Sequence, residues 1–334
     1  AAAAQEHVTD YFYDSTFQEG QVYSYSLSIQ HELLRATKLE VAYVGNQARH
    51  LRNARFFNVA MPEGTRVRLL TGEWITVTGA QKDRRPYPQV RPNWITTSDG
   101  VNYYNSLQAK LERQFRNGFA LSTGYTWARA FGLNYGGSWF SRMPYEFDRR
   151  NTEKGPLDYE RVQSYYASAI WQLPLFRNAD GWASRLLGGW ELSPIITLAS
   201  GSPFGVVVGR DLWDQGPRKV IRADRVSTGQ LPEDQRTVDR FFDTSAFKIP
   251  CCNRLGNASH ASLRTDGLAL VDLSLHKAFR IAEGKTFDFR VDMFNAFNHP
   301  IFTTPDATAD SPSFGQVLGT GDPRNMQLGF RFTF

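Results

Sequence analysis

The feature that most constrains this chain is a regular alternation of apolar and polar residues, which continues to the last position. The chain ends MQLGFRFTF, where Met326, Leu328, Phe330, Phe332 and Phe334 alternate with polar or very small residues. Successive side chains of a β-strand point to opposite faces, so this period predicts strands with one apolar and one polar face. The same pattern recurs in segments 22–30, 38–44, 102–115, 119–128, 270–277 and 286–298 and, less regularly, in 158–173 and 188–200.

The length of these segments separates a membrane barrel from a soluble sheet. The pattern predicts roughly nine strands, most of about 10–13 residues, whereas soluble proteins usually have strands of about 5–6 residues. A tilted strand needs about 9–11 residues to cross a bilayer. Aromatic residues make up 14% of the chain, which is more than a soluble core requires. No stretch approaches the run of about 18 apolar residues that a transmembrane helix needs.

The connections between the predicted strands provide an independent test, because short and long connections alternate along the chain. Short connections are expected at 34–36, 116–118 and 281–285, a medium one at 174–187, and long ones at 47–101, 131–157, 201–265 and 299–323. Transmembrane barrels have short periplasmic turns and long extracellular loops, and a closed barrel pairs the backbone groups that lie in lipid. We therefore expect residues 1–334 to be part of one all-β, antiparallel barrel domain in the outer membrane of a Gram-negative-type bacterium.

The alternation also assigns a face to each side chain. In the last strand Phe330 and Phe332 would face lipid, and Phe334 would lie in the aromatic girdle at the periplasmic interface. The polar residues between them would face an aqueous lumen, where a charge remains solvated. Charged and titratable side chains expected on that lumen face are Lys110, Glu112, Asp272, His276, Asp288, Arg290, Asp292 and Arg331.

Several stretches resemble the C-terminal barrel of TonB-dependent outer-membrane receptors, specifically the Oar-like group that carries a carboxypeptidase-regulatory-like domain. Their order and spacing carry the resemblance over most of residues 102–334. The matching stretches are YNSLQAKLERQFRNGFALSTGYTWARA, GPLDYERVQSYYASAIWQLPLF, LLGGWELSPIITLASGSPF, LALVDLSLHKAF, RVDMFNAFNHPIF and MQLGFRFTF.

The resemblance implies a barrel of about 22 strands around a globular plug, of which this chain supplies roughly the last nine. The plug, the N-terminal domains and the earlier strands are expected to lie outside this sequence. The resemblance further implies import of a bulky nutrient, with TonB as partner through the N-terminal region. It implies contact of the lumen residues with the plug, and recognition of the strand ending in Phe330, Phe332 and Phe334 by the barrel assembly machinery. Outer-membrane lipid and lipopolysaccharide are the remaining expected partners.

Two predicted outer loops combine basic and aromatic residues, which suit glycans, acidic sugars, peptides or lipopolysaccharide phosphates. The opposing interpretation is that these loops pack on one another and cap the barrel. A hairpin is also expected inside the first loop, at residues 66–79. The ligand-binding candidates are Arg84, Arg85, Tyr87, Arg91, Trp94, Trp139, Phe140, Tyr145 and Arg149.

No catalytic or cofactor motif is present, so we expect neither an enzyme nor a bound cofactor or metal. Charges of both signs are interspersed, which argues against nucleic acid as a partner. The adjacent pair Cys251 and Cys252 could form a disulfide or be incidental. Three alternatives to an importer stay open: a passive porin-like channel, a structural subunit whose loops bind partner proteins, and a soluble β-sandwich adhesin.

Overall fold

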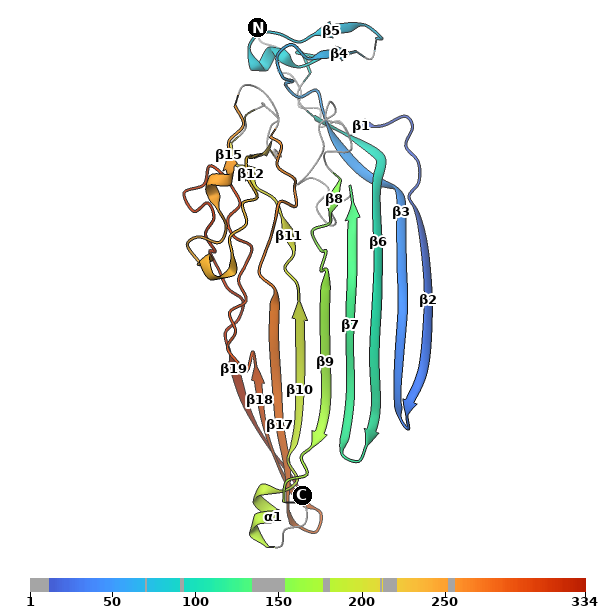
Figure 1. Ribbon diagram of the computed structural model, residues 1–334, viewed down its shortest axis with the longest axis vertical. Coiled ribbons are helices and arrows are strands. Elements are labelled where there is room, and N and C mark those ends of the chain that lie inside the picture. Colours follow the sequence, from blue (N-terminus) through green and yellow to red (C-terminus); the bar gives the residue numbers. More distant parts are fainter. Residues whose placement is uncertain are drawn as a thin grey trace.

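One large antiparallel sheet dominates the computed structural model, which describes residues 12–69, 71–90, 93–133, 154–176, 181–210, 212, 221–251 and 256–334 (Figure 1). Its nine long strands follow one another in chain order across the sheet, so each pairs with its sequence neighbours. All nine predicted strands are confirmed. They are β2 (Gln21–Leu34), β3 (Thr37–Phe57), β6 (Asn93–Arg116), β7 (Phe119–Gly132), β9 (Gln163–Gln172), β10 (Glu191–Ala199), β17 (Leu268–Ala282), β18 (Lys285–Phe294) and β19 (Asn325–Thr333).

The remaining elements are short and lie in the connections. The predicted hairpin is present as β4 (Arg66–Arg68) and β5 (Trp74–Thr76). Two further strands extend the large sheet, β1 (Phe12–Tyr13) beside β6 and β8 (Gly155–Pro156) beside β7. The others are η1 (Gln81–Arg84), α1 (Trp182–Leu187), β11 (Pro203–Phe204), β12 (Val207–Val208), β13 (Ile221–Arg222), β14 (Asp224–Arg225), η3 (Glu233–Gln235), η4 (Thr244–Ala246), β15 (Phe247–Lys248) and β16 (Leu263–Arg264).

The short turns all lie at one end of the sheet and the long connections at the other (Figure 1). The outer sheet extends further than the alternation predicts, because β3 and β6 have 21 and 24 residues. Their ladder continues through pairs such as Asn53 with Thr97, beyond the apolar stripe. Polar side chains are solvated outside the membrane while the backbone stays paired, so the hydrophobic pattern does not mark where such a strand ends. In β18 the alternation predicts a strand that is too long. It continues to residue 298, whereas the strand ends at Phe294 and a turn begins at Asn295.

The register confirms that the two faces of the sheet differ in chemistry. Leu39, Leu111 and Thr123 pair across β3, β6 and β7, and their neighbours Lys38, Glu112 and Ser122 pair on the opposite face. The apolar face carries exposed leucine, isoleucine, tyrosine and tryptophan side chains, as expected of a surface whose solvent is lipid. The opposite face is the lumen face.

The main apolar core lies outside the sheet, in the long connections that follow β10 and β18. Buried residues of segments 203–208, 221–223, 241–247 and 258–263 pack together, with Phe242 at their centre. The ring of Phe242 contacts the rings of Phe204, Phe247 and Phe314 at centroid distances of 6.0, 5.8 and 5.3 Å. We call the described residues of 203–265 and 299–317 the outer module. Two long loops thus pack on one another here, but they are not the two loops in which ligand-binding residues were predicted.

Among the described residues, β2 and β19 are the two edges of the large sheet, and neither pairs with a further strand. The sheet therefore does not close into a barrel within the described part of the chain. No helix in that part is long and apolar enough to cross a membrane.

Candidate functional site

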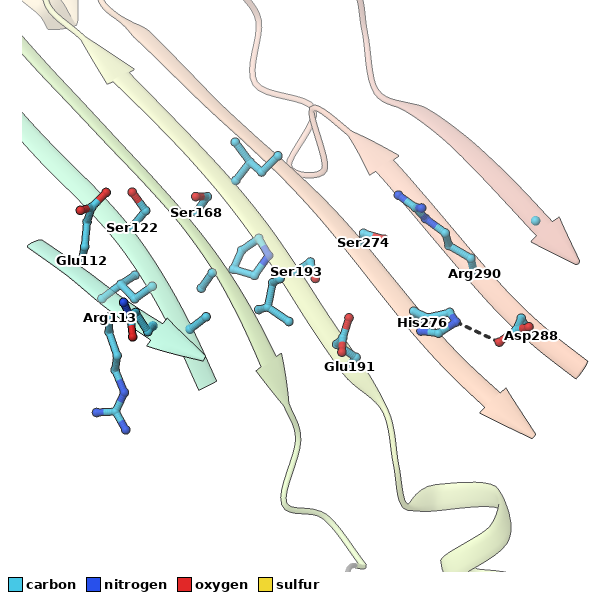
Figure 2. A pocket seen from close by; sticks show the side chains of 18 of the residues that line it. Glu112, Arg113, Ser122, Ser168, Glu191, Ser193, Ser274, His276, Asp288 and Arg290 are labelled. Carbon is cyan, nitrogen blue, oxygen red and sulfur yellow. Dashed lines mark hydrogen bonds and ion pairs between the residues drawn. The ribbon is translucent and has the colours of Figure 1, made fainter. Parts of the chain in front are cut away.

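The lumen face carries a hollow of about 1080 Å³ over strands β6, β7, β9, β10, β17, β18 and β19 (Figure 2). The charged lining residues of β10, β17 and β18 lie on one face, because the register is continuous across these strands. Ser122 pairs with Ser168, Glu191 with His276, and His276 with Arg290. Ile170, Pro194 and Ile195 add apolar surface, so the lining mixes polar and apolar groups. The hollow is thus a broad wall rather than an enclosed pocket.

Three ion pairs on this wall are water-accessible. His276 Nε2 lies 3.4 Å from Asp288 Oδ1, Arg290 Nε donates to Asp292 Oδ1 at 2.9 Å, and Lys110 Nζ lies 2.6 Å from Glu112 Oε1. Exposed pairs of this kind contribute little to stability because water screens them. They are better suited to hydrogen bonding with another polar surface than to holding the sheet together.

The structure places the sequence-predicted lumen residues on one face of the sheet. Glu112, His276, Asp288, Arg290 and Arg331 line the hollow directly. The other three lie on the same face through their register partners, since Lys110 pairs with Gly124, Asp272 with Ile195, and Asp292 with Ser274. Contact of these side chains with a plug stays a prediction.

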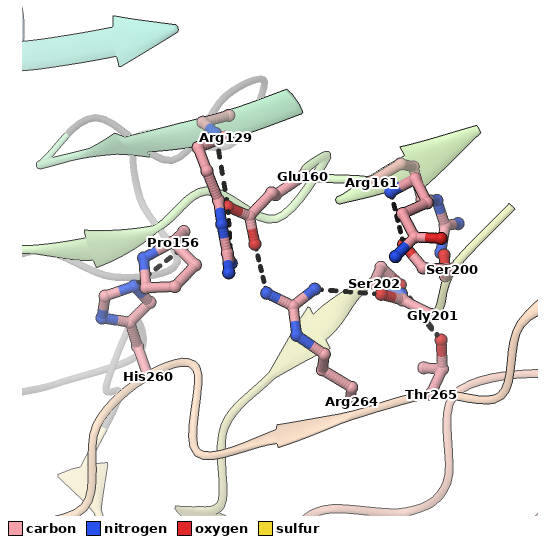
Figure 3. A network of polar contacts seen from close by, with 12 residues as sticks. Arg129, Pro156, Glu160, Arg161, Ser200, Gly201, Ser202, His260, Arg264 and Thr265 are labelled. Carbon is pink, nitrogen blue, oxygen red and sulfur yellow. Dashed lines mark hydrogen bonds and ion pairs between the residues drawn. The ribbon is translucent and has the colours of Figure 1, made fainter. Parts of the chain in front are cut away.

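A second polar site, which sequence reasoning missed, joins the outer ends of the strands to the outer module (Figure 3). Glu160 is 2% exposed, and its carboxylate binds the Arg264 guanidinium and accepts a hydrogen bond from the backbone N–H of Ala130 at 3.3 Å. Arg264 also donates to the Gly201 carbonyl oxygen at 3.1 Å. Arg129 Nη1 lies 3.8 Å from Glu160 but is 63% exposed. We call these residues the outer clasp.

The outer clasp is extended by contacts on either side. His260 Nε2 lies 3.1 Å from the Pro156 carbonyl oxygen, and Ser202 N donates to Thr265 Oγ1 at 3.0 Å. These contacts join segments as far as 104 residues apart. The only sequence signal is that Glu160 and Arg264 are charged residues beside predicted strands, which describes many surface residues equally well.

The predicted ligand-binding residues are more dispersed than expected. Arg84 lies in η1 and is 2% exposed, so its side chain is not on the loop surface. Arg85 Nη1 donates to the Val90 carbonyl oxygen at 3.2 Å. The Asn58 side chain binds both the N–H and the carbonyl of Tyr87, at 2.8 and 2.9 Å, and so holds this loop against the end of β3.

Trp94 lies within β6 rather than in a loop, because the β3–β6 ladder continues past the membrane-sized segment. Ligand contact by Arg85 and Tyr87 stays a prediction. The other candidates, Arg91, Trp139, Phe140, Tyr145 and Arg149, lie outside the described residues.

The outer module contains two carboxylates held by local donors. Burial alone would raise the pKa of Asp310, but N–H groups of Gly209 and Arg210 donate to it at 2.5 and 3.0 Å and hold the pKa below its ordinary value. Burial would also raise the pKa of Asp306, but hydrogen bonds from neighbouring hydroxyl and N–H groups outweigh burial and lower that pKa. One of these donors is Ser313 Oγ, at 2.7 Å. Asp310 therefore ties the loop after β18 to the segment after β12, whereas Asp306 fixes a turn within that loop.

The C-terminal aromatics form a ladder at the short-turn end of the sheet. The Phe330 ring lies 5.4 Å from that of Phe289 and 6.0 Å from that of Phe287, and Phe332 stacks on Phe334 at 5.9 Å. All three C-terminal rings are exposed on the apolar side of β19 or beyond its end. This arrangement fits an interfacial girdle. Their part in assembly stays a prediction.

Long antiparallel strands in chain order, an apolar outer face and a polar lumen face together define an outer-membrane β-barrel protein. A family model described as "Outer membrane beta barrel domain" matches residues 1–327. The chain therefore belongs to that family and is located in the outer membrane. Among the described residues, no group of three or more His, Cys, Asp or Glu side chains is arranged to hold a metal ion.

Solved structures similar to this chain include several much longer outer-membrane proteins. The outer membrane transporter YddB from Escherichia coli is 8% identical with a TM-score of 0.49, over 98% of this chain and 35% of that one. The ferric preacinetobactin receptor BauA from Acinetobacter baumannii is 12% identical with a TM-score of 0.48, over 94% and 29%. The pyoverdine outer membrane receptor FpvA from Pseudomonas aeruginosa is 11% identical with a TM-score of 0.47, over 97% and 31%.

The chain thus spans about a third of the length of these proteins. No curated protein matches its sequence.

Proposed function

We propose that this chain is the C-terminal part of the barrel of a TonB-dependent receptor of the Oar-like group, which imports a bulky nutrient such as a glycan, peptide or chelate. The observation that carries the proposal is a wide, open lumen wall with charged groups, together with edge strands β2 and β19 that pair with no further strand among the described residues. Unpaired backbone groups are costly in lipid, so β2 and β19 require further strands. Barrels of about 22 strands are wide enough to hold a plug.

The proposed mechanism consists of binding and gating without a covalent step. The outer loops bind the nutrient, and the lumen wall holds the plug through groups such as Glu112, His276 and Arg290. These groups are partly exposed and form ion pairs with Lys110, Asp288 and Asp292 respectively, so they can exchange partners at a small free-energy cost. Work transmitted through TonB would rearrange the plug and open a path along this wall.

The decisive experiment measures uptake of candidate nutrients by cells that carry the full-length protein, with and without TonB. The transported compound is identified as the one whose uptake is lost in cells from which the gene for the full-length protein is deleted. We expect uptake of that compound to require both the receptor and TonB. Uptake that needs the receptor and persists without TonB would refute active import and favour a passive channel. Unchanged uptake of every compound in the deletion strain would favour a structural role.

Loop recognition has its own test in the same cells. Arg85→Ala removes a basic side chain from a predicted binding loop, and Glu283→Ala is the matched control in a periplasmic turn. We expect weaker nutrient binding for Arg85→Ala alone, with equal amounts of both variants in the outer membrane. Equal binding by both variants would contradict the assignment of Arg85 to ligand contact.

A further inference from the structure

The connection between β9 and β10 differs from the other turns at its end of the sheet. Three turns there are tight, with Arg35–Ala36, Asn117–Gly118 and Glu283–Gly284 between successive strands. Each contains or adjoins a charged residue, as expected of a tip in water. The β9–β10 connection instead runs from 173 to 190 and contains the helix α1. A hairpin needs only about two residues, so this length serves something other than strand reversal.

The described residues of this connection expose a large apolar surface. Trp182 is 70% and Leu186 is 53% exposed, and they lie on one side of α1 at a spacing of four residues. Leu175, Phe176 and Leu187 are also exposed, and Arg185 is the charged residue among 181–190. The carbonyl oxygens of Leu175 and Phe176 lie beside Gly188, so the two ends of the connection meet. We call Leu175, Phe176 and residues 181–190 the β9–β10 lobe.

Contacts with the sheet place the lobe on its lipid-facing side. Lys277 shares the parity of Leu273 and Leu275, which face lipid, and its ammonium group donates to the Gly188 carbonyl. That ammonium group lies 5.6 Å from the ring of Trp190. The indole N–H of Trp190 donates in turn to the carbonyl of Leu186 at 3.2 Å. The end of α1 is therefore fixed against the outer wall rather than over the lumen.

The lobe also lies at the level of the periplasmic aromatic girdle. Lys277 pairs with Phe289, which pairs with Phe330, so all three side chains lie in one row across β17, β18 and β19. The Lys277 ammonium group is 4.9 Å from the ring of Phe279, which lies two residues closer to the β17–β18 turn. Figure 1 shows α1 at the same end of the sheet as the C-terminus. The apolar surface of the lobe thus continues the lipid-facing surface of the barrel.

We propose that the β9–β10 lobe is a membrane anchor that inserts Trp182 and Leu186 into the periplasmic phospholipid leaflet of the outer membrane. Tryptophan and leucine on a short helix, with a basic residue beside them, suit the boundary between acyl chains and headgroups. Arg185 can reach the phosphate layer while its methylenes stay in apolar surroundings. Continuity with the lipid-facing band selects phospholipid over a partner protein as the occupant.

The test is the immersion depth of a nitroxide label at Leu186→Cys in the full-length protein, in bilayers of phosphatidylethanolamine and phosphatidylglycerol. Cys251 and Cys252 are first replaced by serine so that only the intended site reacts. Leu107→Cys, in the lipid-facing band, and Glu283→Cys, in a tight turn, are the controls. Folding of each variant is checked by heat-modified mobility on gels, so that only assembled protein is compared.

We expect the label at 186 to be accessible to oxygen and protected from a water-soluble nickel chelate, at a depth of about 5–10 Å below the headgroup boundary. Its depth should fall between those at 107 and 283. Nickel accessibility equal to that at 283 would overturn the proposal, because the lobe would lie in water. Protection from both reagents with an immobilised spectrum would also overturn it, because the occupant would then be protein.

Discussion

The outer clasp allows a sharp prediction about how the outer module is held to the barrel wall. Replacing Glu160 by alanine removes the carboxylate that binds Arg264 and accepts from the Ala130 N–H. The Ala130 N–H and the Arg264 guanidinium then lose this acceptor in a site where Glu160 itself is almost fully buried. The same Arg264 side chain binds the Gly201 carbonyl, just before the outer module begins. When Arg264 loses Glu160, its hold on this segment should loosen.

The magnitude follows from burial. Removing one partner of a buried ion pair costs about 3–5 kcal/mol, and the partial exposure of Arg264 puts this case at about 3 kcal/mol. That corresponds to roughly a 100-fold increase in local opening. Glu160→Gln keeps an acceptor for Ala130 and should cost about 1.5 kcal/mol, or roughly tenfold. Arg129→Ala removes an exposed partner and should cost less than about 1 kcal/mol.

Hydrogen–deuterium exchange of the reconstituted protein measures these differences at the Thr265 amide, which donates to the Ser202 carbonyl. The rates should increase in the order Arg129→Ala, Glu160→Gln, Glu160→Ala. Exchange in the tight turn at Glu283 should not change. Equal and small effects for all three variants would refute the claim that Glu160 and Arg264 hold the module to the wall.

Three further predictions test the faces, the packing and the loop electrostatics. Leu107→Arg on the lipid face should cost about 2–4 kcal/mol in urea unfolding, whereas its neighbour Gln108→Arg on the lumen face should be near neutral; equal costs would contradict the face assignment. Gly124→Ala should destabilise by about 1–3 kcal/mol, because a Cβ there would lie 2.4 Å from the Tyr166 ring, and Tyr166→Ala should suppress the loss. Because the pKa of Asp310 is lowered in the folded protein, its carboxylate stabilises the fold above its unfolded pKa of about 3.9, and this contribution is lost as pH falls from there through the folded pKa. Exchange of the Gly209 amide, which donates to Asp310, should therefore accelerate in acid. Asp310→Asn should abolish this pH dependence.

Period-two patterning sufficed to predict the nine long strands, and the faces of those that alternate regularly, because lipid on one side and water on the other select the side chain at each position. Leu107 and Gln108 illustrate this, since adjacent positions lie on opposite faces. Where both faces meet water the pattern disappears, and the outer halves of β3 and β6, including Asn53 and Trp94, were therefore predicted as loop. There the continuous backbone ladder, which leaves little trace in side-chain polarity, determines the structure.

The sites were less predictable for a related reason. The lumen residues share a face because the register carries parity from strand to strand, so His276 and Asp288 could be assigned together. Glu160 and Arg264 are brought together by loops folding over a distance of 104 residues, and no local period encodes such a contact. The core around Phe242 was missed likewise, because strands of two residues are too short to alternate.

The central claim is that this chain is part of a larger plugged receptor, and the intact mass of the native protein tests it most directly. The protein would be extracted with detergent from outer membranes and weighed beside the 37.9 kDa of this sequence. We predict a single polypeptide with a mass several tens of kilodaltons above that value, which would accommodate the remaining strands and a plug. A native mass equal to that of this sequence alone would contradict the proposed receptor.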